Sequence, residues 1–170
     1  MKRPIWLIVF AGIAVFFASS IVSAKTASSA AVEKSARAGV NALNQKEEVA
    51  CREMDNTKSG ALWAEDGVDL IQGLEPMVGK ATIVKWYDSL TSQTKGAKME
   101  YCTIDWKQIK IQGDWAWEWA ITKQKIDFPG QPKPFESAGK MVYILKKQAD
   151  GEWRIELESW NSMPAPEETR

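Results

Sequence analysis

Residues 113–128 read GDWAWEWAITKQKIDF, a turn followed by a long strand with two different faces. Gly and Asp open it as a turn signal, and the side chains then alternate in character. One face carries Trp115, Trp117, Trp119 and Ile121, and the other carries Ala116, Glu118, Ala120, Thr122 and Gln124. Successive strand side chains point to opposite faces, and each indole can bury a large apolar area. We therefore expect the tryptophan face to be buried, either as plain core or as the wall of an apolar ligand pocket.

Three similar runs accompany this strand in the second half of the chain. The four strand-like runs are Lys98 to Ile111, Trp115 to Phe128, Glu136 to Gln148 and Glu152 to Met163. Short segments rich in Gly, Pro and Asp separate them, which is typical of tight turns. Four runs joined in this way predict an antiparallel meander.

The first half has a helical period instead. Apolar residues recur at helical spacing between residues 31 and 64, which predicts two helices broken near Asn44 or near Asp55, the second ending at Gly67. A short strand over 68–72 with its return at 77–79 follows, and then a third helix over 80–92. Helices first and a meander afterwards predict an α+β fold, with three N-terminal helices packed on a strongly curved antiparallel sheet.

The first 24 residues have the layout of a secretory signal peptide. Two basic residues at positions 2 and 3 precede an apolar run over 5–17, and Val22-Ser23-Ala24 ends it. A retained membrane anchor is the alternative, because the uncharged stretch is nearly long enough to span a bilayer. We expect cleavage after Ala24, a periplasmic or secreted protein, a flexible tether over 25–31, a folded domain over 32–163 and a frayed tail over 164–170.

Composition excludes several classes of function. The chain has 22 basic and 22 acidic residues, and two of the basic residues lie in the signal segment, so the mature domain carries a formal charge of −2. This charge gives no reason to expect nucleic-acid binding. No histidine is present, which removes Ser-His-Asp chemistry and His-based metal sites, and we expect no metal or cofactor. Cys51 and Cys102 could form a disulfide after export or remain two buried thiols.

The last run allows two registers. Trp153, Ile155 and Leu157 share one parity, whereas Glu156, Glu158 and Trp160 share the other. A β-bulge between Leu157 and Trp160 would turn Trp160 inward and bring Glu158 or Asn161 close to the pocket. Without the bulge, both glutamates are ordinary solvated surface.

Five short motifs resemble the SnoaL-like branch of the nuclear transport factor 2-like superfamily. They are Trp63-Ala64-Glu65-Asp66-Gly67-Val68, the turn from Gly73 to Gly79 with the helix start after it, Gly113-Asp114-Trp115-Ala116-Trp117, Asp150-Gly151-Glu152-Trp153-Arg154-Ile155, and Ser159-Trp160-Asn161. The resemblance implies a cone-shaped α+β barrel, with an apolar cavity at the wide end and homodimers through the sheet. Ketosteroid isomerases of this fold use a pocket aspartate as base, with a tyrosine and a second carboxylic acid as the oxyanion hole.

This sequence departs from the isomerase pattern. The matched base position falls at or near Ile71, and the oxyanion position falls near Tyr143. The leading interpretation is therefore binding of a small apolar or aromatic molecule without catalysis. The expected lining is Trp63, Trp86, Trp117, Trp119, Tyr143 and Trp160. The alternative is an isomerase, cyclase or hydratase with Glu158 or Asp69 as base and Tyr143 polarising a carbonyl. A third possibility is a structural dimer whose cavity is filled by its own side chains.

Overall fold

The computed structural model describes residues 16–164, with side chains from residue 30 onward. Its contacts divide the chain into two units, residues 1–35 and 36–170. Helix α1, Phe16–Glu53, crosses this boundary, so the segment 25–31 that we expected to be a flexible tether is helical. The first 15 residues of the expected signal peptide and the last six of the expected tail lie outside the described residues. Among the described helices, none combines the length and hydropathy needed to cross a membrane.

Two further helices follow α1 in the second unit: α2, Asn56–Ala61, and α3, Lys80–Gln93. The chain breaks between α1 and α2 at Met54, whose φ of 53° is left-handed, and the Asp55 side chain caps α2 by accepting from the Lys58 amide at 3.0 Å. The break between the two helices was expected near Asn44 or near Asp55, and the structure confirms the position near Asp55. The expected end at Gly67 is wrong, because α2 ends at Ala61 and Gly67 lies within a strand.

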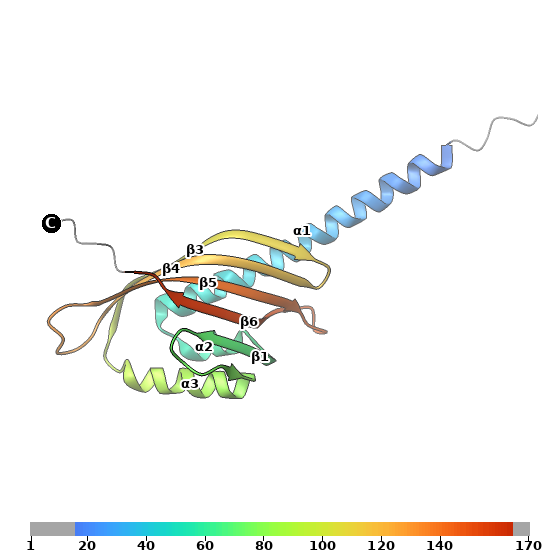
Figure 1. The fold of residues 1–170 in the computed structure, drawn as a ribbon. Helices are drawn as coiled ribbons and strands as arrows, with labels where there is room; N and C mark the ends of the chain where they lie inside the picture. Colours follow the sequence, from blue (N-terminus) through green and yellow to red (C-terminus); the bar gives the residue numbers. More distant parts are fainter. Residues whose placement is uncertain (1–15, 165–170) are drawn as a thin grey trace, which may run out of the picture. The chain divides into compact units, whose positions relative to one another are not determined.

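Six strands form one sheet in the order β2-β1-β6-β5-β4-β3 (Figure 1). The strands are β1, Trp63–Ile71; β2, Met77–Val78; β3, Lys98–Gln112; β4, Trp115–Asp127; β5, Phe135–Lys147; and β6, Trp153–Ser162. The last four form the expected antiparallel meander. The sheet is nevertheless mixed and open, because β1 pairs with β6 in parallel and the two edge strands, β2 and β3, do not meet.

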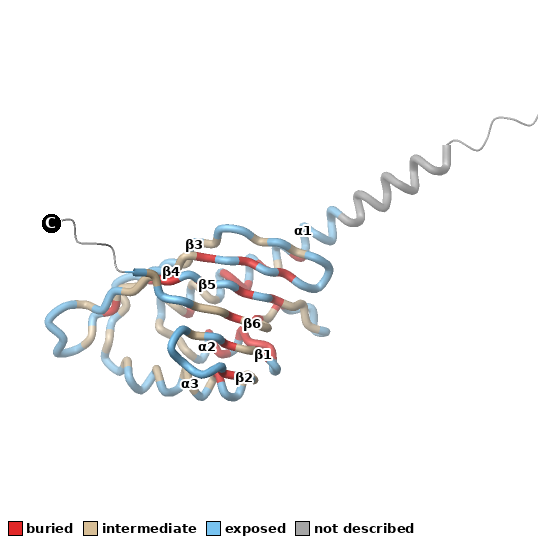
Figure 2. The backbone as a smooth tube through the Cα atoms, in the orientation of Figure 1, coloured by how far each residue is buried: buried red, intermediate tan, exposed pale blue. Residues whose placement is uncertain are grey.

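The expectation for the faces of β4 is wrong. The tryptophans at positions 115, 117 and 119 are 46%, 43% and 36% exposed, whereas Ala116, Glu118 and Ala120 between them are at most 4% exposed. Figure 2 shows this alternation as buried and exposed segments along β4. The buried positions lie opposite Leu145, Tyr143 and Met141 of β5, which are also buried. Large side chains from β5 and the helices occupy the inner face, so the neighbouring β4 positions there are two alanines and one glutamate.

Strand β6 contains a bulge, but it lies between Ile155 and Leu157 and not, as predicted, between Leu157 and Trp160. Opposite the consecutive β5 residues Ile144 and Leu145 stand Leu157 and Ile155, so Glu156 is the extra residue. Before the bulge the odd-numbered Trp153 and Ile155 are buried, and after it the even-numbered Glu158 is buried. The shift therefore brings Glu158 and Trp160 to the inner face, as the sequence predicted for a bulge.

Candidate functional site

Four polar side chains form a row across the inner face of the sheet. Strand pairing places Asp69 of β1 opposite Glu158 of β6, Glu158 opposite Tyr143 of β5, and Tyr143 opposite Glu118 of β4. All four are buried, and none is more than 8% exposed. Three carboxyl groups in one buried row are unusual, because ionised carboxylates are seldom buried without a partner. This row is the first element of the candidate site.

Burial and mutual repulsion change the titration of the two carboxyls at one end of the row. Burial raises the pKa of Asp69 to about 6. The pKa of Glu158 lies well above its ordinary value, because of burial first and then of the nearby charges of Asp69 and Glu47. A side-chain hydrogen bond with Tyr143 opposes this rise. Burial and the neighbouring charges therefore favour the neutral acid form of Glu158, a state that can donate a hydrogen bond or a proton.

The helices add a third carboxyl and a second tyrosine facing this end of the row. Glu47 of α1 has its pKa raised to about 7 by burial, and a side-chain hydrogen bond with Ser59 of α2 moderates the rise. The pKa values of Tyr87 of α3 and Tyr143 are well above the ordinary value through burial, and also through the charges of Glu47, Glu158 and Asp69. These mutual influences place residues from three helices and three strands in one electrostatic cluster.

Glu118, at the other end of the row, has a partner on α1. The side-chain amide nitrogen Nδ2 of Asn44 donates to Oε2 of Glu118 at 2.9 Å, and both residues are buried. Burial raises the pKa of Glu118 to about 7, and the Asn44 hydrogen bond opposes the rise. This pair connects α1 to β4 at a second buried carboxyl position.

Two adjoining chambers open beside the cluster. The larger, about 490 Å³, lies between the ends of α1, α2 and α3 and the ends of β3, β4 and β5, and Trp86, Tyr87, Phe128 and Phe135 contribute its aromatic wall. The smaller, about 140 Å³, is lined by Glu158, Trp160, Met141 and Ile104 among others. Glu47, Cys51 and Gln124 line both chambers. An apolar outer chamber thus adjoins an inner pocket that carries two of the perturbed carboxyls.

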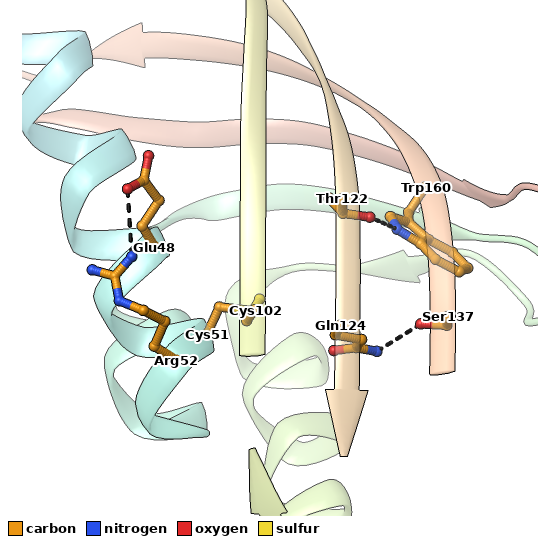
Figure 3. The surroundings of a disulfide bond; sticks show 8 residues. All are labelled: Glu48, Cys51, Arg52, Cys102, Thr122, Gln124, Ser137 and Trp160. Atoms are coloured by element: carbon orange, nitrogen blue, oxygen red, sulfur yellow. Dashed lines mark hydrogen bonds and ion pairs between the residues drawn. A yellow bond between two sulfur atoms is a disulfide. The ribbon is translucent and has the colours of Figure 1, made fainter. Parts of the chain in front are cut away.

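A disulfide forms part of the wall between the chambers. Cys51, in the last turn of α1, is bonded to Cys102 of β3, which settles the pairing that the sequence left open. Figure 3 shows the bond beside Gln124, which donates to the Ser137 hydroxyl at 3.0 Å, and Trp160, whose Nε1 donates to Oγ1 of Thr122 at 3.1 Å. Cys102 lines the inner pocket and Cys51 both chambers. The disulfide therefore holds the end of α1 at the candidate site.

The structure separates the six side chains that we expected to line one cavity. Trp86 lines the outer chamber and Trp160 the inner pocket, and Tyr143 lies buried beside Glu158. Trp63 is fully buried in the hydrophobic core and lines neither chamber. Trp117 and Trp119 lie on the opposite, exposed face of the sheet, so their expected place in the lining is wrong. The three catalytic candidates, Glu158, Asp69 and Tyr143, all lie in the buried row.

The sequence analysis missed Glu47, Tyr87 and Glu118. The alternation of β4 contained Glu118, but the inner face was assigned by indole size instead of by pairing with β5. Glu47 follows the buried Leu43 by four residues, a helical spacing that could have placed it on the same face of α1. Among the residues that the structure describes, no group of three or more Cys, Asp or Glu side chains is arranged to hold a metal ion.

Comparisons with known proteins identify the fold. A ketosteroid isomerase-like protein from Erwinia carotovora atroseptica has a TM-score of 0.64 at 19% identity, over 75% of this chain and 96% of its own. ActVI-ORFA from Streptomyces coelicolor has a TM-score of 0.61 at 14% identity, over 74% and 96%. A protein with a cystatin-like fold from Nostoc punctiforme has a TM-score of 0.58 at 14% identity, over 77% and 93%.

No protein-family model and no curated protein matches the sequence. The structural similarities nevertheless show the fold: the chain has the α+β cone fold that these ketosteroid isomerase-like and cystatin-like structures share. The fold that the sequence motifs implied is therefore confirmed. Because this fold carries both enzymes and non-enzymes, function has to be argued from the site.

Proposed function

We propose that the domain binds a small, mainly apolar or aromatic molecule, with its apolar body in the outer chamber and one polar group in the inner pocket. The observation that carries the proposal is the adjacency of the two chambers. The larger has a volume of about 490 Å³ and aromatic walls, and the smaller contains Glu158 and Glu47. Sites of roughly 300 Å³ or more that are mostly apolar, with a few convergent polar groups, are typical of small-molecule binding.

A naphthalene series tests this binding. Naphthalene, 2-naphthol and 2-naphthoic acid share one body and differ in the polar group, and binding is read from tryptophan fluorescence and from the thermal shift. We expect Trp86→Ala to weaken binding by roughly tenfold, because it removes one aromatic wall of the outer chamber. Trp117→Ala is the matched control, since its indole lies on the other face of the sheet. Equal losses in both variants, or no binding of any probe, would contradict the proposal.

A specific observation favours catalysis as a second function. The sequence analysis kept an isomerase, cyclase or hydratase as the alternative to binding without catalysis, and Glu158 lines the inner pocket beside Tyr143. We propose that ionised Glu158 takes a proton from the carbon next to a bound carbonyl group, while the Tyr143 hydroxyl donates a hydrogen bond to the carbonyl oxygen. Where the bound compound is a β,γ-unsaturated ketone, the product of this step is a dienolate, and returning the same proton to its γ-carbon moves the double bond into conjugation and completes an isomerisation.

The proton-transfer step can be measured without knowing the natural substrate. We expect the protein to accelerate exchange of the α-protons of 2-tetralone with deuterium, followed by NMR, with a rate that rises with pH as Glu158 ionises. Glu158→Gln should abolish the acceleration, and Tyr143→Phe should reduce it by roughly 100-fold. Glu75→Gln, at an exposed position, is the control. An acceleration that survives Glu158→Gln would reject this role for Glu158.

We further propose that the protein is exported, with cleavage after Ala24 and a periplasmic or secreted mature form. The Cys51–Cys102 disulfide supports this proposal, because such bonds persist mainly in oxidising compartments. N-terminal sequencing of the protein purified from its native host tests it: a mature chain beginning at Lys25 is expected. A chain that still carries Met1 in the cytoplasm would contradict export.

We also propose a homodimer formed through the outer face of the sheet. The exposed indoles of Trp115, Trp117 and Trp119 adjoin exposed Val142 and Ile144 of the neighbouring strand β5. Contiguous exposed apolar surface of this kind is typical of an interface. A second copy is the occupant that the implied family arrangement favours.

A further inference from the structure

The buried pair of Asn44 and Glu118 has an imbalance in its hydrogen bonds. Nδ2 of Asn44 donates to Oε2 of Glu118 at 2.9 Å, and this is the one hydrogen bond between the two groups. The other two side-chain atoms, Oδ1 of Asn44 and Oε1 of Glu118, are buried without any partner. Both unpaired atoms are acceptors while Glu118 is ionised, so neither can satisfy the other. Two unpaired acceptors in one contact are costly in a buried position.

A single proton on Glu118 removes the imbalance. An amide and a carboxylic acid can form a closed ring of two hydrogen bonds, one from the amide nitrogen to the acid carbonyl and one from the acid hydroxyl to the amide oxygen. The first bond of such a ring is present, and its two remaining atoms are the two unpaired ones. Burial also raises the pKa of this carboxyl to about 7, which is consistent with a protonated state.

We propose that Glu118 is a neutral acid that closes a two-hydrogen-bond ring with Asn44, and that its ionisation weakens the attachment of α1 to the sheet. The ring joins the last third of α1 to β4, and both of its residues are buried. Ionisation replaces one hydrogen bond by a repulsion between two acceptors, so the helix loses this attachment as the pH rises. The disulfide at Cys51 keeps the end of α1 in place, which confines the change to the part of the helix before it.

The surroundings of Glu118 oppose its ionisation or leave it unaffected. Tyr143 on β5 lies directly opposite, and β3 presents the apolar Ile109. On α1, Glu47 and Glu48 follow Asn44 by three and four residues, with Glu48 accepting from Nε1 of Trp106 on β3 at 3.1 Å. Arg37, two turns before Asn44, is exposed. The titration of Glu118 is governed by burial and by Asn44.

The direction of the pH effect follows from linkage. A carboxyl whose pKa is raised in the folded state contributes stability that is fully present below its unfolded pKa and is lost as the pH rises through the folded value. For Glu118 this window runs from its ordinary value of 4.5 to about 7. The attachment of α1 is therefore expected to be complete in mild acid and weakened above neutral pH.

Glu118→Gln separates the ring from the charge. A glutamine amide can form the same two hydrogen bonds with Asn44 but cannot ionise. Amide hydrogen exchange over residues 36–50, corrected for the intrinsic rate, is measured at about pH 5.5 and about pH 8. Both proteins, with and without E118Q, carry Glu47→Gln, which removes the other buried carboxyl that titrates within this segment. We expect opening of the segment to increase roughly tenfold or more between the two pH values when Glu118 is present, and to stay constant within about twofold when E118Q is added. Glu75→Gln, at an exposed position, should leave the pH profile of opening unchanged.

An infrared titration provides a test that does not depend on E118Q folding. The variant used carries Glu47→Gln, Glu158→Gln and Asp69→Asn. These changes remove the other two carboxyls of the row and the carboxyl of α1 that faces it, so that Glu118 is the one of the four that remains. A band of a protonated carboxylic acid that disappears near neutral pH is expected. The absence of this band at about pH 5.5, or the same pH profile of exchange with and without E118Q, would overturn the proposal.

Discussion

Asp69 on β1 lies opposite Glu158 on β6, and among the described residues no side chain donates a hydrogen bond to the Asp69 carboxylate. Two buried carboxyls in this position are not both ionised at low cost, because the repulsion between them adds to the cost of burial. One proton held by the pair would supply the donor that Asp69 lacks. The two groups are thus expected to titrate as a unit, with both pKa values raised.

The first prediction concerns this pair. Because the pKa of Asp69 is raised to about 6, its contribution to stability is complete below its ordinary value of 3.8 and is lost as the pH rises through about 6. Asp69→Asn removes this loss. The free energy of unfolding of the variant should therefore rise relative to the wild type by on the order of 2 kcal/mol between about pH 4 and pH 8, measured by urea denaturation. Glu75→Gln, at an exposed site, should change nothing; a flat Asp69→Asn difference would contradict the prediction.

A second prediction concerns Trp160, whose ring packs over Gly139 of β5. A Cβ atom at position 139 would lie 2.4 Å from the indole, too close for any real contact. Gly139→Ala should therefore displace Trp160 and its hydrogen bond to Thr122, with a loss of roughly 1–3 kcal/mol in the free energy of unfolding. Thr122→Val, which removes the hydrogen bond and keeps the shape, should cost less, about 1 kcal/mol. Equal losses would show that the close packing contributes nothing.

The order of the elements was predictable from the sequence, and the reason is local. Turn residues bound each strand, so the four meander strands were placed to within one residue at either end. The start of α3 at Lys80 was predicted equally well. The parallel pairing of β1 with β6 was not, since it joins segments about 90 residues apart and leaves no local signal.

The faces of β4 could not be assigned from its own composition. Three indoles on one parity suggested burial, but the inner face was already filled by Tyr143 and Met141 of β5 and by Trp63. Only the register between β4 and β5 decides which parity faces them. For β6 the sequence analysis predicted that a bulge would turn Glu158 and Trp160 inward. The bulge at Glu156 has this effect although its position differs, because one extra residue anywhere before Glu158 exchanges the two faces of the strand. The sequence analysis therefore predicted that Glu158 and Trp160 belong to the candidate site, but it missed Glu47 and Glu118.

A third prediction follows from the exposed indoles of β4. If they form the dimer interface, Trp117→Ser should shift the protein from dimer to monomer in sedimentation equilibrium, with at least a roughly tenfold weaker dimerisation constant. Leu74→Ser, which also removes an exposed apolar side chain but lies in the turn between β1 and β2, is the matched control. A wild type that is monomeric at all concentrations, or a variant that remains dimeric, would contradict the proposed interface.

A fourth prediction concerns the bond between Cys51 and Cys102, which closes a loop of 51 residues between α1 and β3. In the chain-entropy description, opening a loop of this length lowers the free energy of unfolding by about 4 kcal/mol, because the unfolded chain regains freedom. The double variant Cys51→Ser and Cys102→Ser should lose this amount and become insensitive to reductant, whereas reduction of the wild type should produce the same loss. Because Cys51 lines both chambers, the double variant should also bind the naphthalene probes more weakly. A displaced end of α1 would alter the wall that the two chambers share. If the double variant loses stability but binds the probes as tightly as the wild type does, the disulfide therefore supports the fold and not the chambers.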